Sequence, residues 1–202
     1  WARDNVPAIV DAWYPGQAGG TAIADVLFGD YNPAGRLPVT FYQSARQLPP
    51  FEDYNMKGRT YRYFTGEPVF PFGYGLSYTQ FAYRNLKVPA ATSGTADFKV
   101  TVEVQNTGKL AGEEVVQLYL KRLGASVPVP IRSLEGFQRI SLKPGESKTV
   151  EFTVSPRQLT VIDKDNVRRV EPGTFEVSAG GKQPGFRGAA DASTTGVVTA
   201  QF

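Results

Sequence analysis

Two pairs of adjacent acidic residues, Glu52-Asp53 and Glu113-Glu114, are the first candidates for chemistry in this chain. Two carboxylates can share the acid and base roles at one bond when their side chains lie about 5 to 9.5 Å apart, but neighbours in a sequence rarely converge in this way. Glu113 and Glu114 border a predicted strand, so we interpret them as solvated surface acids. Glu52 and Asp53 lie in an aromatic-rich segment, where lining a cleft is an open alternative to simple exposure.

Residues 59–64, with the sequence RTYRYF, interleave guanidinium groups and aromatic rings. This pattern suits stacking on the faces of sugars or nucleobases. It suits interdomain anchoring equally, with arginine paired to a carboxylate and its plane packed on tyrosine, and we favour anchoring. With the acid pair, this region supplies the candidate substrate-binding residues of a cleft: Glu52, Asp53, Tyr54, Arg59 and Tyr61.

A glycine-rich turn at residues 16–20 precedes a predicted helix and could present free N–H groups to an anion. It lacks the lysine and the serine or threonine of a phosphate-binding loop, and its glycines do not have the dinucleotide-binding spacing. We therefore favour a structural role, in which the glycines allow a tight turn and close helix packing. A nucleotide-binding protein built on this turn is the weaker alternative.

Histidine and cysteine are absent from the 202 residues. The chain therefore cannot build a histidine or cysteine zinc site, a disulfide, a thiol nucleophile or an imidazole base. The 22 basic residues are interspersed with 19 acidic ones, which argues against nucleic-acid binding. No apolar run approaches the roughly 20 residues of a membrane helix. We expect no metal, no cofactor, no nucleic acid and no membrane partner.

Residues 1–30 have the pattern of one strand and one helix. The apolar run over residues 6–13 predicts a buried parallel strand, and residues 21–28 predict a helix that Gly29 ends. This is the pattern of the last βα unit of an α/β domain. One strand and one helix cannot bury a core, so we expect the unit to need neighbours that this chain does not contain.

Residues 31–94 show no long helical or strand periodicity, although much of the aromatic content of the chain lies here. A disordered linker would be poor in aromatic residues. We expect an ordered interdomain segment, here called the strap, that lies on other protein surface and is held there by buried rings.

Residues 95–202 alternate between apolar and polar side chains in short runs separated by turns. This period of two predicts an antiparallel β-sandwich of the immunoglobulin or fibronectin type III kind. The fold class is therefore an α+β fragment followed by an all-β domain. The predicted strands cover residues 98–104, 115–120, 133–140, 148–154, 174–179 and 197–202.

Four ordered motifs resemble family 3 glycoside hydrolases. Residues 12–20 (AWYPGQAGG) and 22–40 (AIADVLFGDYNPAGRLPVT) are similar to the end of that family's second domain. Residues 61–64 (YRYF) and 70–78 (FPFGYGLSY) look like its next two signatures. Residues 95–202, with VVQLY at 115–119 and LEGF at 134–137, resemble its fibronectin type III-like domain.

The resemblance implies a retaining exo-β-glycosidase of the β-glucosidase or β-xylosidase type, acting on terminal β-linked glucose or xylose of oligosaccharides. The family's nucleophilic aspartate and acid/base glutamate lie upstream of these motifs, so no catalytic residue is expected in this chain. The resemblance also implies two partners, an N-terminal catalytic chain of the same enzyme and a glycoside substrate. It further implies a periplasmic or secreted location and leaves a homodimer as an open option.

A carbohydrate-binding or adhesion module without catalysis is the alternative function. In that case Tyr119 or Phe137 would stack on a glycan, because aromatic side chains exposed on a sandwich can serve as binding platforms.

Overall fold

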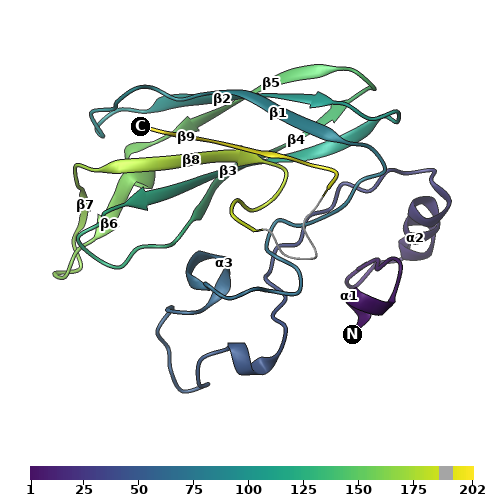
Figure 1. The fold of residues 1–202 in the computed structure, drawn as a ribbon, viewed down its shortest axis with the longest axis horizontal. Helices are drawn as coiled ribbons and strands as arrows, with labels where there is room; N and C mark the ends of the chain where they lie inside the picture. The colour runs from purple at the N-terminus through teal and green to yellow at the C-terminus, as the bar shows by residue number, and fades with distance from the viewer. Residues whose placement is uncertain (187–192) are drawn as a thin grey trace.

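The computed structural model describes residues 1–186 and 193–202, and in these residues seven strands form two antiparallel sheets packed face to face (Figure 1). The three-stranded sheet has the order β1-β2-β5, with β1 at Phe81–Lys87, β2 at Phe98–Asn106 and β5 at Ser147–Val154. The four-stranded sheet has the order β4-β3-β8-β9, with bounds Ser133–Leu142, Gly112–Leu123, Thr174–Gly180 and Val197–Gln201. The predicted fibronectin type III-like sandwich is confirmed.

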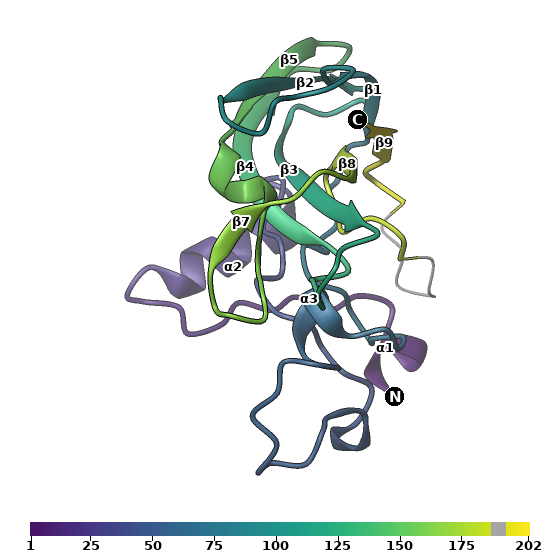
Figure 2. The same cartoon turned by 90° about the vertical axis from the view of Figure 1, so that its left-hand side faces the viewer.

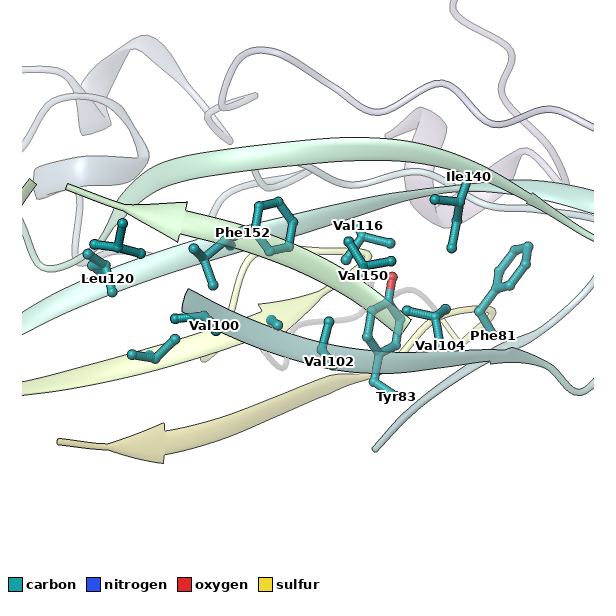
Figure 3. Packing of buried hydrophobic residues seen from close by; sticks show 14 of the residues in the cluster. Phe81, Tyr83, Val100, Val102, Val104, Val116, Leu120, Ile140, Val150 and Phe152 are labelled. Carbon is teal, nitrogen blue, oxygen red and sulfur yellow. The ribbon is translucent and has the colours of Figure 1, made fainter. Parts of the chain in front are cut away.

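The core lies between the two sheets because alternate side chains of each strand point inward. Val100, Val102 and Val104 of β2 are fully buried, and Val116 and Leu120 of β3 face them from the other sheet (Figure 3). The polar residues between these valines remain partly exposed on the outer face. All six strands predicted from alternation are present at the expected places.

Strand β1 lies inside residues 31–94, which were expected to form the strap. It pairs with β2 from Phe81 to Arg84 and again at Lys87, with an irregularity between. Asn85 in this gap has a φ of 54°, which interrupts the regular strand conformation. In the sequence the apolar alternation covers only Phe81 and Tyr83, and this pattern is too short to predict a strand. The sandwich therefore takes in residues assigned to the strap, and the boundary at residue 94 stays a prediction.

A short hairpin of β6, Thr160–Ile162, and β7, Arg168–Val170, lies beside the main sheets and follows the 3₁₀ helix η2, Pro156–Leu159. Its turn spans residues 163–167, with Asn166 at a φ of 59°.

The predicted helix is confirmed as α2, Gly19–Phe28, which begins two residues earlier than expected. Gly29 has the left-handed conformation, φ 86°, that ends the helix. The predicted strand over residues 6–13 is wrong: the chain starts with a short helix α1, Ala2–Asn5, and then runs without strand pairing. A strand needs a hydrogen-bonded neighbour, and no described segment pairs with these residues, which leaves Ile9 and Val10 exposed.

The strap is irregular between residues 31 and 80 apart from a 3₁₀ turn η1, Ala45–Gln47, and a helical turn α3, Thr60–Tyr63. Figures 1 and 2 show it on the far side of the four-stranded sheet from the three-stranded one. Its rings pack in pairs, with Tyr61 stacked on Phe72 at 4.0 Å and Tyr42 edge-on to Phe64 at 4.8 Å between ring centroids. None of the helices described is long and apolar enough to span a bilayer.

Candidate functional site

A buried ion pair joins the strap to the sandwich. Arg36 Nη2 donates to both carboxylate oxygens of Glu114, at 3.2 and 3.1 Å, and Arg36 Nε donates to Gly181 O at 3.1 Å. The side chains of Arg36 and Glu114 are only 5% and 0% exposed. Burial raises the pKa of Glu114, and the positive charge of Arg36 opposes this rise.

The expectation that Glu114 is a solvated surface acid is therefore wrong. Glu114 is in phase with Val116 and Leu118 on β3, so its side chain points to the inward face at the end of the strand. The period of two was the signal that could have identified Glu114 as buried.

Glu113 points to the other face and remains partly exposed, as expected. Its carboxylate accepts hydrogen bonds from the hydroxyl of Tyr31, at 2.8 Å, and from Arg139. These two bonds lower the pKa of Glu113. Because Tyr31 belongs to the strap, Glu113 also fastens the strap to the sandwich, at a more exposed position.

Gly73 of the strap lies on the outer face of β3. Its carbonyl oxygen accepts from Gln117 Nε2 at 3.1 Å, and the hydroxyl of Tyr119 donates to Gln117 Oε1 at 2.6 Å. Tyr119 is 1% exposed, so the expectation that it offers a platform for a glycan is wrong: the strap covers it. Phe137 of β4, the other expected platform, is 67% exposed.

Helix α3 anchors the strap at a further contact with the sandwich. The hydroxyl of Tyr61 accepts a hydrogen bond from the backbone N–H of Leu134 at 3.0 Å. Arg62 Nη2 donates to Ser133 Oγ at 2.8 Å, and the Arg62 carbonyl accepts from Ile131 N at 2.7 Å. Anchoring was the favoured interpretation of residues 59–64, and Tyr61 and Arg62 make such contacts.

Arg59 organises the segment of residues 50–59, here called the 50–59 loop. Its guanidinium donates to the carbonyl oxygens of Pro50 and Asn55, both at 3.1 Å, and to that of Asp53. The sequence interpretation had paired arginine with a carboxylate, whereas Arg59 binds three backbone carbonyls of its own loop. These bonds fix the loop without help from the sandwich.

Asp53 closes a second set of contacts within the 50–59 loop. Its carboxylate accepts from the backbone N–H and the side-chain amide of Asn55, at 2.9 and 2.7 Å. These hydrogen bonds lower the pKa of Asp53. Phe51 and Tyr54 project from the loop and are both 87% exposed. The loop thus holds two aromatic side chains outward on a hydrogen-bonded base.

Four of the five candidate residues, Glu52, Asp53, Tyr54 and Arg59, lie in the 50–59 loop, whereas Tyr61 lies against the sandwich. The Asp53 carboxylate is engaged by Asn55, and Glu52 is exposed. Within the residues that the structure describes, no group of acidic side chains could hold a metal ion.

Residues 1–30 carry a concentration of exposed apolar side chains. These side chains lie on helix α2 and on the segment before it, and they include Val6, Ile9, Val10, Trp13, Tyr14, Leu27 and Phe28. Exposed apolar side chains that are gathered in this way mark an interaction surface.

The glycine turn that precedes helix α2 is tight. A Cβ on Gly19 would lie 2.4 Å from the Pro15 side chain, so the structural interpretation of the turn fits this geometry.

Two family models match this chain. Residues 1–78 match the glycosyl hydrolase family 3 C-terminal domain, and residues 114–183 match the fibronectin type III-like domain. A xylan 1,4-beta-xylosidase of Xylanibacter ruminicola is 51% identical over 88% of this chain and 20% of its own length. A periplasmic beta-glucosidase of Salmonella typhimurium is 44% identical over 86% of this chain and 24% of its own.

This chain is also similar in structure to solved glucosidases. A b-glucosidase from Erythrobacter marinus superposes with a TM-score of 0.79 at 38% identity, covering 99% of this chain and 26% of that one. Beta-D-glucoside glucohydrolase from Trichoderma reesei superposes with a TM-score of 0.77 at 30% identity, covering 93% and 29%. The chain therefore spans about a quarter of the length of the proteins it matches.

Proposed function

Because this chain belongs to glycosyl hydrolase family 3, we propose that it is the C-terminal structural part of a retaining exo-β-glycosidase. The assembled enzyme would hydrolyse terminal β-linked glucose or xylose from oligosaccharides. The similarity to a xylan 1,4-beta-xylosidase favours xylose.

The contrast between the strap and residues 1–30 carries this proposal. Toward the sandwich, the strap is held by the buried pair of Arg36 and Glu114 and by Tyr61. In residues 1–30, which precede the strap, apolar side chains such as Trp13 and Phe28 remain exposed. A strap that is fixed to the sandwich and preceded by an exposed apolar segment is suited to clamp a further domain, here the N-terminal catalytic chain of the same enzyme.

Chemistry in the assembled enzyme would come from that N-terminal chain. Retaining hydrolysis uses one carboxylate as nucleophile and a second carboxyl group as acid and then base, about 5 Å apart. The proposal assigns neither role to a residue of this chain. The proposed contribution of this chain is to complete the α/β domain and to hold the strap in place.

The 50–59 loop is proposed to wall the substrate cleft. Glu52, Asp53, Tyr54 and Arg59 would form the wall, with Tyr61 anchoring its base. In support, Arg59 ties the loop to three of its own carbonyls, so Tyr54 is presented outward on a fixed support. A fixed aromatic ring is suited to stacking on a sugar face.

A periplasmic or secreted location is part of the proposal, supported by the periplasmic beta-glucosidase among the relatives. The homodimer stays a prediction, which light scattering of the assembled enzyme can test.

The central test is activity of the separated parts. The 202-residue chain alone is expected to leave aryl β-glucosides and aryl β-xylosides unhydrolysed. Mixing it with a separately produced N-terminal part is expected to restore turnover. Hydrolysis by the 202-residue chain alone would overturn the proposal.

A carbohydrate-binding module is the second candidate, and the exposed ring of Phe137 favours it. Affinity electrophoresis in gels with xylan separates the two functions, because a binding module is retarded and a scaffold is not. A Phe137→Ala variant is the control, since retardation through this ring would disappear in it.

A further inference from the structure

A pocket of about 280 Å³ at one end of the sandwich brings four arginines together. Arg62 reaches it from α3, Arg122 from β3, Arg157 from η2 and Arg168 from β7. Glu135 is the one carboxylate among the lining residues. Four like charges around one pocket repel each other, so the arrangement favours a negative occupant.

Arg122 is the buried member of the group, with a side chain 5% exposed. Its Nη2 donates to the carbonyl oxygens of Glu171 and Pro172, both at 3.0 Å, and lies 3.3 Å from Glu171 Oε2. Its guanidinium carbon lies 5.1 Å from the centre of the Phe175 ring. Its Nε and Nη1 are buried without a hydrogen-bond partner. Buried donors left without acceptors are costly, so Arg122 has unused binding capacity.

The other three arginines form no ion pair within the described residues. Arg62 donates to Ser133 Oγ and Arg168 Nη1 donates to Thr160 Oγ1, both at 2.8 Å, so neutral oxygens are their partners. Arg157 is exposed. Because no carboxylate is paired with these three guanidinium groups within the described residues, their charge is available to an anion in the pocket that they share with Arg122.

The acidic groups near the pocket are already engaged. Glu135 accepts from Gln158 Nε2 at 3.1 Å, and Glu171 accepts from Ser126 as well as from Arg122. Two carboxylates face four arginines, which leaves a positive excess.

We propose that this pocket binds a small oxyanion, either the carboxylate of a sugar acid or a phosphate group. Guanidinium groups bind both through paired, charge-assisted hydrogen bonds. The site is separate from the proposed cleft wall, because none of its lining residues belongs to the 50–59 loop. The inference therefore does not depend on the glycosidase proposal.

Isothermal titration calorimetry on the 202-residue chain tests the site, with inorganic phosphate and glucuronate as the two probes. Glucose and sodium chloride at matched ionic strength are the controls. We expect one-to-one binding of phosphate or glucuronate and none of glucose. The probe that binds more tightly identifies the source of the anion. Absence of binding by both probes beyond the chloride control would overturn the proposal.

Variants locate the binding in this pocket. Arg157→Gln combined with Arg168→Gln is expected to weaken binding at least about tenfold, since one charge-assisted hydrogen bond contributes about 1.5 to 3 kcal/mol. Arg46→Gln, on η1 and outside the pocket, is the matched control and should bind as the unchanged chain does. Equal binding by the double variant and the control, with unchanged melting temperatures, would overturn the assignment.

Discussion

Arg36 and Glu114 lie 78 residues apart in the sequence and form an ion pair that is sealed from solvent. Arg36 belongs to the strap and Glu114 to the inward face of β3, so the pair links the irregular part of the chain to the core. A buried charge is tolerated only with its partner, because desolvation of a lone charge costs several kcal/mol.

Replacing Glu114 by alanine is expected to lower the free energy of unfolding by about 3 to 5 kcal/mol, because Arg36 would be left buried without a counter-charge. Urea denaturation measures the change. The control is Glu113→Ala, whose partly exposed pair should cost about 1 kcal/mol or less. Equal losses in the two variants would contradict a special role for the buried pair.

The sandwich could be predicted from sequence because its signal is local. In β2, Val100, Val102 and Val104 alternate with polar residues, and such a period of two needs no knowledge of distant partners. Glu114 carried the same signal, in phase with Val116, but its charge led to an exposed assignment. Its partner Arg36 could not be found, because nothing near Arg36 in the sequence indicates which strand the strap crosses.

The strap and the candidate cleft were less accessible to prediction for the same reason. The aromatic content indicated an ordered segment, but the contacts of Tyr61 with Phe72 and Leu134 join residues with no common period. Burial of Tyr119 under Gly73 likewise depends on the course of the strap. At residues 6–13 the apolar run indicated a strand, but strand formation depends on a neighbour that no described residue supplies.

Gly73 is expected to tolerate no side chain. Its φ is 76°, and a Cβ there would lie 2.3 Å from Gln117 Oε1 and 2.8 Å from the Tyr119 hydroxyl. Gly73→Ala should therefore lower the free energy of unfolding by about 1 to 3 kcal/mol, through backbone strain and loss of the contacts of Gln117. Thermal and urea unfolding measure it.

Gly16→Ala is the matched control, because a Cβ on Gly16 meets nothing within 4 Å and its φ is not in the left-handed region. It should change stability by less than about 1 kcal/mol. If Gly73→Ala were as mild, the close approach of the strap to β3 would be incorrect.

Tyr83 is expected to lower the stability of the folded chain at alkaline pH. Burial raises its pKa well above the usual value, and the nearby Glu114 carboxylate raises it further. The unfolded chain loses this proton near pH 10, while the folded chain keeps it. Above that pH the unfolded state binds fewer protons than the folded state, so stability falls as pH rises.

A Tyr83→Phe variant removes this contribution. Its free energy of unfolding should fall less steeply between about pH 9 and pH 11 than that of the unchanged chain. Urea unfolding across this range measures the slopes, and absorbance of tyrosinate reports the ionisation directly. Parallel slopes for the two proteins would mean that Tyr83 ionises in the folded state at its ordinary pKa.

Tyr54 is expected to affect substrate binding in the assembled enzyme. Its ring is 87% exposed on the 50–59 loop, so Tyr54→Ala should leave the stability of this chain unchanged. If the loop walls the cleft, loss of stacking on the substrate should raise KM about twofold to tenfold, with little change in kcat, because stacking contributes about 0.5 to 1.5 kcal/mol.

The matched control for Tyr54 is Phe137→Ala, which removes an exposed ring from β4 of the sandwich and should leave KM unchanged. Arg59→Ala should resemble Tyr54→Ala in KM, because it frees the carbonyls of Pro50, Asp53 and Asn55 that hold the loop in shape. Kinetics with aryl β-xylosides and xylo-oligosaccharides measure all three variants. Unaltered KM in both loop variants would remove the 50–59 loop from the cleft and leave it as an exposed surface loop.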